Sequence, residues 1–205
     1  MQIKLFYDKI TYCNSYLVIK DNDCVVIDTG GKDMSELISY IKENNLNLKS
    51  ILITHGHFDH IIGTDEVLEY KEVPVYVGAE DEKFFYDHRL SLSYWIDMEY
   101  KLNEKYKLNK INDGDIIFDF LCISTPGHTK GSTCFYNKEH KIMFTGDTLF
   151  KEAYGRTDFP TGDARELRDS LNKLLSMDKD ITIYPGHGES STIEEEYNNY
   201  FGMYY

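Results

Sequence analysis

The chain has 205 residues, of which 22 are Lys or Arg and 35 are Asp or Glu, so its formal net charge is −13 at neutral pH. This acidic balance argues against a protein that binds the phosphates of nucleic acid. With 41% hydrophobic residues, the chain can build one globular domain over residues 1–205. Its apolar runs last only a few residues, whereas a membrane helix needs roughly 18, so we expect no membrane span.

The N-terminus and the cysteines both favour a cytoplasmic protein. The first ten residues alternate like a strand and lack the basic and apolar regions of a signal peptide. No Cys-x-x-Cys pair occurs, and the cysteines stand in apolar, strand-like stretches, where buried free thiols are the usual explanation. The four cysteines are Cys13, Cys24, Cys122 and Cys134.

The first eighty residues alternate between predicted strands and amphipathic helices, which is typical of α/β folds. In chain order we expect strands at 3–6, 15–19 and 24–28, a helix at 33–44, a strand at 50–54, a helix at 61–70 and a strand at 73–77.

The pattern changes between residues 80 and 108, where many aromatic residues, Trp95 among them, stand between charged ones. We expect helices and loops that cover another part of the molecule. Either the aromatic rings pack this insert onto the core, which is the commoner role, or they line a pocket.

Strands return in the second half of the chain, and two helices follow them. Alternation predicts strands at 115–124, 131–136, 141–145 and 181–184. Asp163 and Glu166 form a capping box at the start of a helix, and Ser191 with Glu194 predicts the cap of a terminal helix.

Five of the seven histidines stand in short segments flanked by Gly, Thr and Asp. The window His55-Gly-His-Phe-Asp-His60 directly follows the predicted strand at 50–54 and holds three imidazoles and one carboxylate. These groups are the usual ligands of zinc and similar metals, and a loop beyond a strand end can aim alternate side chains at one point. The window therefore predicts a metal site.

Three more segments place a potential ligand just after an apolar strand and small residues. They end at His128, Asp147 and His187. Gly and Pro in these segments allow tight turns in which the backbone comes close to a metal. Each segment alone is more typical of a solvated turn, but beside the histidine cluster we interpret all three as further ligands.

This set, H-x-H-x-D-H followed by H, D and H, each after a strand, resembles the metallo-β-lactamase superfamily over nearly the whole chain. The resemblance implies a four-layered αββα sandwich with a metal site at the sheet edge. It also implies two divalent ions, most simply zinc, with iron and manganese as alternatives. By the family's pattern, one ion is held by His55, His57 and His128, the second by Asp59, His60 and His187, and Asp147 bridges both.

Three segments resemble the short, single-domain relatives of glyoxalase II, or hydroxyacylglutathione hydrolase. They are Phe-Thr-Gly-Asp-Thr-Leu-Phe at 144–150, Gly-Arg-Thr-Asp-Phe-Pro at 155–160 and Tyr-Pro-Gly-His-Gly at 184–188. The C-terminal helical domain that supplies cationic contacts to glutathione in the full-length family has no counterpart here. The resemblance therefore implies a thioester hydrolase and leaves the thiol open.

The implied mechanism is attack of a metal-bridging hydroxide on the thioester carbonyl, with Asp59 orienting the water and handling its proton. Asp147 partly neutralises the ions. Arg156 lies on the loop after Asp147 and, with Asp158, is a candidate for substrate binding; a pairing of these two side chains that holds the loop is an equal alternative. Three threonines either orient imidazoles or simply end strands: Thr54, Thr125 and Thr145.

Several rival functions share parts of this pattern. A persulfide dioxygenase with a single iron shares the Gly-Arg-Thr-Asp-Phe segment. By that resemblance, however, a small residue is expected at the position of Phe58. A hydrolase of another ester or lactone remains open. Nucleases fit the acidic charge poorly. A flavin-linked di-iron reductase would want a carboxylate in place of His57, and zinc β-lactamases with a Cys ligand differ at Asp147.

A metal-stabilised scaffold is the non-enzyme alternative. Structural zinc sites are normally closed and four-coordinate, whereas seven His and Asp ligands shared by two ions leave positions for water. The expected partner is a small-molecule thioester, with neither nucleic acid nor membrane.

Overall fold

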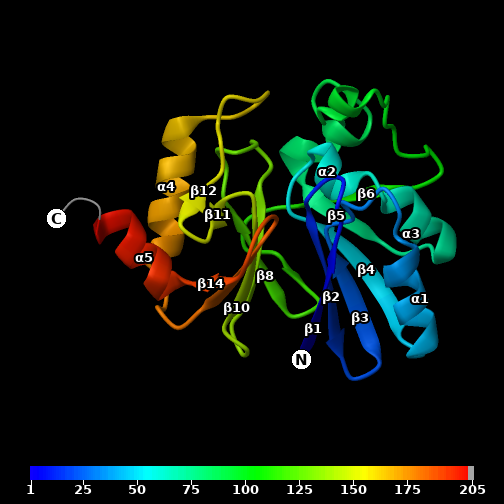
Figure 1. Ribbon diagram of the computed structural model, residues 1–205, viewed down its shortest axis with the longest axis horizontal. Coiled ribbons are helices and arrows are strands. Elements are labelled where there is room, and N and C mark those ends of the chain that lie inside the picture. Colours follow the sequence, from blue (N-terminus) through cyan, green and yellow to red (C-terminus); the bar gives the residue numbers. More distant parts are fainter. Residues whose placement is uncertain (203–205) are drawn as a thin grey trace. The chain divides into compact units, whose positions relative to one another are not determined.

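The computed structural model describes residues 1–202. The chain divides into two compact units, Met1–Ile111 and Asn112–Tyr205, and each unit has a six-stranded sheet of its own. In Figure 1 the first unit runs from blue to green and the second from green to red. The expectation of one domain over residues 1–205 stays a prediction.

The first unit is built on a mixed sheet whose strands follow the chain order. The three N-terminal strands are antiparallel, and each later strand pairs in parallel with the one before it. The strands are β1 (Gln2–Tyr7), β2 (Asn14–Lys20), β3 (Asp23–Ile27), β4 (Asn47–Ile53), β5 (Val75–Gly78) and β6 (Leu108–Ile111).

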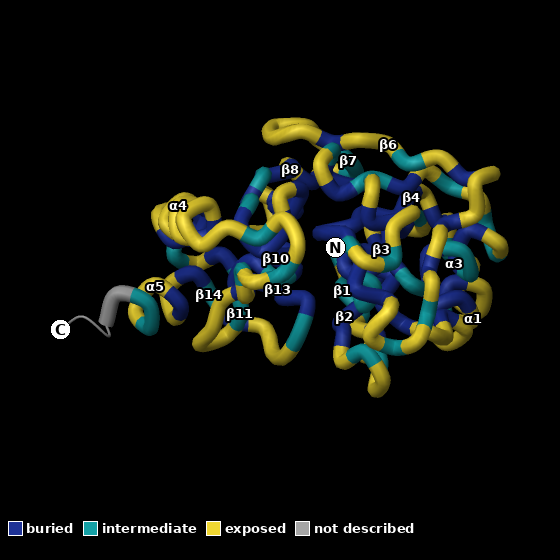
Figure 2. The backbone as a smooth tube through the Cα atoms, turned by 90° about the horizontal axis from the view of Figure 1, so that it is seen from above, coloured by how far each residue is buried: buried dark blue, intermediate teal, exposed yellow. Residues whose placement is uncertain are grey.

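Parallel strands need crossover connections, and helices supply the first two of them. Helix α1 (Ser35–Glu43) joins β3 to β4, and α3 (Thr64–Tyr70) precedes β5. Each helix turns an apolar stripe toward the sheet, and Leu37 and Val67 are fully buried members of the resulting core. Figure 2 shows buried and exposed residues alternating along α1, while most of β3 and of β4 is dark blue.

One helix prediction for the first unit was inaccurate. The helix expected at 61–70 is divided into α2 (Phe58–Ile61) and α3, so Asp59 and His60 lie in a helical turn of their own. The break falls at Gly63, where a Cβ atom would lie 2.5 Å from the carbonyl oxygen of Gly31.

The predicted insert at 80–108 consists of short helices and extended chain. Two 3-10 helices, η1 (Ala79–Phe85) and η2 (Ser93–Ile96), occupy part of it. Its last residue starts strand β6, which the sequence did not predict, because its Leu-Asn-Lys-Ile pattern is too short and polar to stand out.

The second unit has a mainly antiparallel sheet. Only β10 and β13 run parallel. In spatial order its strands are β14 (Ser191–Thr192), β13 (Thr182–Pro185), β10 (Ile142–Gly146), β9 (Thr133–Asn137), β8 (Phe120–Ser124) and β7 (Ile116–Ile117).

Two helices and a small hairpin complete the second unit. Helix α4 (Ala164–Leu175) packs its buried leucines against strand residues such as Met143 and Ile183, and α5 (Ile193–Gly202) follows β14. Strands β11 (Leu149–Phe150) and β12 (Ala153–Tyr154) form a hairpin that the sequence did not predict.

The helix caps were predicted correctly once and wrongly once. Asp163 caps α4, because its side chain accepts hydrogen bonds from the backbone N–H groups of Arg165 and Glu166. For α5, Ser191 is not the cap. The neighbouring Thr192 accepts a 3.2 Å hydrogen bond from the N–H of Glu195.

One predicted strand, at 115–124, is a tight hairpin instead. Phe118 and Asp119 both have positive φ, 48° and 67°, which reverses the chain between β7 and β8. Such a conformation is uncommon for these residue types, so the sequence did not reveal it.

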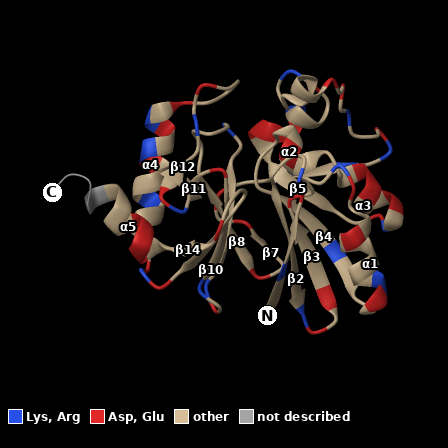
Figure 3. Cartoon of the chain, in the orientation of Figure 1, with Lys and Arg blue, Asp and Glu red and all other residues tan. Residues whose placement is uncertain are grey.

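Charged residues lie on the helices and on many of the loops (Figure 3). Acidic residues lie in α1, in α3 and in the first turn of α5, while α4 carries both signs. Over the described part of the chain, no helix combines the length and apolar character that crossing a membrane requires.

Candidate metal centre

The predicted H-x-H-x-D-H window spans the turn between β4 and α2 and the first residues of α2. Its three imidazoles are buried: His55, His57 and His60 expose 1%, 3% and 0% of their surface. Gly56 separates the first two, and a Cβ atom there would lie 2.4 Å from the Cβ of Phe84, so only glycine fits this close approach.

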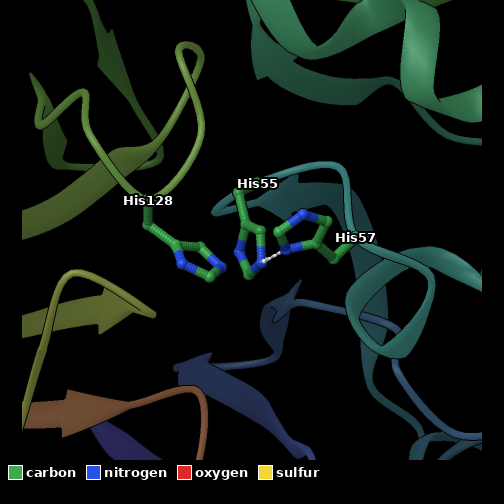
Figure 4. A group of neighbouring side chains, drawn as sticks. All are labelled: His55, His57 and His128. Carbon is green, nitrogen blue, oxygen red and sulfur yellow. Dashed lines mark hydrogen bonds between the residues drawn. The ribbon is translucent and has the colours of Figure 1, made fainter. Parts of the chain in front are cut away.

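The four donors of this window lie close together within the first unit. The Nε2 atom of His55 is 3.0 Å from Nδ1 of His57 (Figure 4). The ligand atoms of His55 and His60 lie within 4.8 Å of each other. The carboxylate of Asp59 reaches to 4.0 Å from Nε2 of His60. Three imidazoles and a carboxylate are thus concentrated at one strand end.

Asp28, which the sequence interpretation overlooked, organises this turn. It follows β3, is buried, and has a left-handed backbone with φ of 58°. Its carboxylate accepts hydrogen bonds from Nδ1 of His60 at 2.8 Å and from the N–H and hydroxyl of Thr54, both at 2.7 Å. The Nδ1 atom of His60 therefore carries the proton, and Nε2 presents its lone pair.

A signal for Asp28 was present in the sequence. Asp28-Thr-Gly-Gly follows an apolar strand, which is the same layout as the three segments interpreted as ligands. Its neighbour Cys13 also approaches His60, with Sγ 3.7 Å from Nδ1. Burial raises the pKa of the Cys13 thiol to about 12, so it is an uncharged neighbour at neutral pH.

The second unit holds three predicted ligands, and two of them, His128 and His187, lie beside the third, Asp147. Nε2 of His128 and Nε2 of His187 each lie 3.6 Å from Oδ2 of Asp147. Asp147 and His187 follow the parallel strands β10 and β13, and the N–H of Gly186 donates a 2.8 Å hydrogen bond to the carbonyl of Gly146 between them. Parallel pairing therefore brings both ligands to one edge of the sheet.

The backbone of the Gly-Arg-Thr-Asp-Phe segment supports these ligands. Nδ1 of His128 donates a 2.8 Å hydrogen bond to the carbonyl oxygen of Arg156. Because a carbonyl only accepts, Nδ1 must be protonated, and Nε2 keeps its lone pair on the side of Asp147. A Cβ atom on Gly155 would lie 1.9 Å from the carbonyl oxygen of Asp147, so the segment packs directly on the backbone of a predicted ligand.

The side chains of Arg156 and Asp158 pair with each other. The guanidinium donates two hydrogen bonds, 2.7 and 2.6 Å long, to the carboxylate, and it stacks 3.9 Å from the ring centre of Phe159. The hydrogen bond from Arg156 lowers the pKa of Asp158 to about 2. The pairing that the sequence left as one of two alternatives is present, and both side chains are exposed.

The three threonines have different partners. Thr54 contacts both Asp28 and Nδ1 of His55, the latter at 3.2 Å. Thr125 instead contacts the hydroxyl of Thr148, and the hydroxyl of Thr145 donates to the carbonyl of Leu149. These two therefore tie strand ends to the following turns.

The donor chemistry fits metal binding in each unit. The first unit offers imidazole nitrogens and the Asp59 carboxylate, and the second offers two imidazoles around Asp147. In His60 and His128, hydrogen bonds at Nδ1 leave Nε2 as the coordinating atom, which is the usual arrangement of metal-binding histidines. Nitrogen and carboxylate donors suit zinc, iron and manganese.

The family model described as the metallo-beta-lactamase superfamily matches residues 9–187. The chain belongs to this superfamily. All seven predicted ligands fall within the matched range. The predicted α/β fold class is confirmed, since the two mixed sheets with their helices are those of a metallo-β-lactamase fold.

Curated relatives include short metallo-hydrolases of similar length. Hydroxyacylglutathione hydrolase GloC of Haemophilus influenzae is 37% identical over 181 residues, covering 86% of this chain and 85% of the relative. The probable metallo-hydrolase YqgX of Bacillus subtilis is 34% identical over 195 residues, covering 92% and 91%. The superfamily member described here is accordingly a metallo-hydrolase.

Solved structures with the same fold carry different names. The B3 metallo-beta-lactamase BLEG-1 superposes with a TM-score of 0.88 at 31% identity, covering 95% of this chain and 96% of the other. TTHA1623, solved in a di-iron-bound form, has a TM-score of 0.85 at 29% sequence identity, and the match covers 94% of this chain and 96% of the other. ETHE1 from Myxococcus xanthus gives 0.78 at 25%, covering 96% and 81%.

Proposed function

We propose that this metallo-hydrolase is a thioesterase of the hydroxyacylglutathione hydrolase type with a binuclear metal centre. The observation that carries the proposal is the donor set: five histidines and two aspartates, with His60 and His128 held by outer partners so that each presents Nε2. The identity of 37% to GloC over most of both chains supports the thioester substrate class.

In this proposal the ligand set is the one that the resemblance to the superfamily implies. His55, His57 and His128 would hold the first ion, Asp59, His60 and His187 would hold the second, and Asp147 would be a ligand of both. Zinc is the first choice because it accepts this donor set without redox chemistry. Iron and manganese accept the same ligands, and the di-iron-bound TTHA1623 makes iron the main competitor.

When bound, two divalent ions would supply a water of lowered pKa, about 7, as nucleophile and would polarise the acyl carbonyl. The protein's own groups hold and orient the reactants. The partly exposed carboxylate of Asp59 lies beside His60 and accepts the proton of the attacking water. Asp28 keeps Nδ1 of His60 protonated, so Nε2 is the nitrogen left to bind a metal and the ring is held in place.

Arg156 and Asp158 form the proposed substrate contact. The exposed guanidinium is already paired with Asp158, so a substrate carboxylate must share or displace that partner. Sharing is feasible because the guanidinium has five N–H donors and the pair uses two of them. This arrangement favours substrates that bear a carboxylate near the thioester. The substrate we expect is a small acyl thioester, and we place its hydrolysis in the cytoplasm, where four free cysteines such as this chain's are stable.

A persulfide dioxygenase is the second candidate function, on the specific ground that ETHE1 shares the fold at 25% identity. It requires one iron and consumes oxygen, so metal content and oxygen uptake separate it from the thioesterase. Esters, lactones and β-lactams belong in the same substrate screen, since the fold is shared with BLEG-1.

The deciding experiment combines elemental analysis of the purified protein with this screen, starting from S-lactoylglutathione. We expect about two metal ions per chain and thiol release. The variant Asp147→Ala should abolish turnover while the protein stays folded, and the exposed Asp169→Ala is the matched control. One iron per chain with oxygen uptake on glutathione persulfide would overturn the proposal.

A further inference from the structure

The 3-10 helix η1 lies directly against the turn that carries His55 and His57. Its Asp81 side chain is fully buried, and Oδ2 accepts a 2.9 Å hydrogen bond from the backbone N–H of Gly56. Gly56 is the residue between the two histidines. The Asp81 carboxylate is therefore directed at the metal-binding turn.

A second residue of η1 fixes the other side of the same glycine. The Cα of Gly56 packs on Phe84, whose Cβ and Cγ leave no room for a side chain there. The Phe84 ring also faces the imidazole of His57, with 5.8 Å between ring centres. Gly56 is therefore held by a hydrogen bond at its nitrogen and by an aromatic ring at its Cα.

A third contact extends this support to the next residue of the turn. The N–H of Phe58 donates a 2.7 Å hydrogen bond to the carbonyl of the buried Ser91. Residues 79–91, interpreted from sequence as a covering insert, thus contact the turn at three successive positions. Two of these contacts satisfy backbone N–H groups that the strand-to-helix transition leaves without helical or sheet partners.

We propose that Asp81 is a positioning residue of the metal centre: its carboxylate fixes the His55-Gly-His turn and adds a buried negative charge beside the imidazoles. The inference rests on the proposed metal centre. Burying a carboxylate is costly unless hydrogen bonds and nearby positive charge compensate for it. The Gly56 N–H provides a hydrogen bond, and a cation held by His55 and His57 would add positive charge nearby. Asp81 acts through Gly56 and touches no reacting atom.

The test compares two Asp81 variants. Asp81→Asn keeps an acceptor for the Gly56 N–H but removes the charge, whereas Asp81→Ala removes both. The matched control is Asp87→Asn, an exposed aspartate of the same segment that accepts a hydrogen bond from the N–H of Arg89. For each protein, zinc affinity is measured by competition with a chelator, melting temperature is measured without metal, and the absorption spectrum is measured after cobalt substitution.

We expect zinc affinity to fall about tenfold in Asp81→Asn and nearer 100-fold in Asp81→Ala, in the range found for outer partners of metal ligands. The cobalt spectrum should change in both variants, while the metal-free Asn protein melts as the wild type does. The control should match the wild type in all three measurements. Should Asp81→Ala fail to fold, the Asn variant alone decides the question.

Wild-type zinc affinity in the Asn variant, at an unchanged cobalt spectrum, would overturn the role of Asp81. The metal-free Asn protein could instead melt at a temperature low enough to account for the whole loss of zinc affinity. Asp81 would then support the fold and would not be a positioning residue of the metal centre. Failure of the proposed function gives a different result, because the wild-type protein would then release no thiol in the substrate screen, whatever its zinc affinity.

Discussion

The two groups of predicted ligands are held by different means. In the first unit, four donors occupy consecutive turns of one segment, and carboxylates from elsewhere in the unit, Asp28 and Asp81, hold that segment. In the second unit, three donors come from separate strand ends, and close backbone contacts through Gly155 and the Arg156 carbonyl hold them. The first group should therefore be sensitive to loss of charge, and the second to added volume.

The strongest test of this contrast is Gly155→Ala. The new methyl group would meet the Asp147 carbonyl at 1.9 Å, so the backbone of a ligand must move. We expect a loss of stability of about 3 kcal/mol and a fall in kcat on the order of 100-fold, as is found for misplaced reacting groups. Chemical denaturation and steady-state kinetics measure the two effects.

Gly114→Ala is the matched control, because no atom lies within 4 Å of a Cβ atom there. Its positive φ of 91° costs only about 1 kcal/mol of backbone strain. Equal losses of stability and of kcat in both variants would show that the close approach of Gly155 to Asp147 is not important for either property.

Asp28→Asn tests the first group. The amide cannot accept the three hydrogen bonds that the carboxylate receives, and its own N–H group would face either Thr54 or the protonated Nδ1 of His60. We expect metal affinity to fall on the order of 10- to 100-fold. The control Asp21→Asn has the same left-handed backbone, with φ of 55°, but lies in the exposed β2–β3 turn. Unchanged affinity in Asp28→Asn would contradict a charge-dependent first group.

Arg156→Gln is expected to have a smaller effect, confined to substrate binding. Its backbone carbonyl still accepts from His128, so the ligand group stays in place, while KM for a carboxylate-bearing thioester rises about tenfold. Arg168→Gln, which removes a comparable exposed Arg–Asp pair on α4, serves as the control. A fall in kcat without a change in KM would assign Arg156 to support of the loop instead.

The smallest effect concerns the thiols, which lie in both units. Burial raises the pKa of Cys13, Cys24 and Cys122 to about 12 and of Cys134 to about 11. A thiol-specific chromogenic disulfide should therefore react with none of them at pH 8 until urea unfolds the chain, when four react. Fast reaction of one thiol in the native protein would reveal local opening near that residue.

The contrast also explains what the sequence could and could not predict. The donors of the first unit were conspicuous because His55 to His60 are contiguous. Their supports were not, since Asp81 reaches Gly56 across 25 residues and Asp28 reaches His60 across 32. A support made by a backbone group, such as the Arg156 carbonyl, cannot be predicted from residue type, because every residue has that group.

The same reasoning applies to the fold. Long, periodic elements such as α4 and the central strands were predicted closely, because burial imposes their pattern. Strands of two residues, such as β11 and β12, and the left-handed turn at Phe118 and Asp119 were missed. These elements depend on neighbours distant in sequence, and no local propensity specifies them.

The parallel pairing of β10 with β13 fixes the positions of Asp147 and His187 relative to each other, although the two ligands are far apart in the chain. Asp147 and His187 keep their spacing through the register of Gly146 with Pro185. Exposed residues between them, such as Ala153 and Tyr154 of the β11–β12 hairpin, can therefore change in sequence without moving either ligand, whereas Gly155 must stay because it packs on the Asp147 carbonyl. A substrate cleft remodelled there, by nature or by design, would inherit an intact pair of metal ligands.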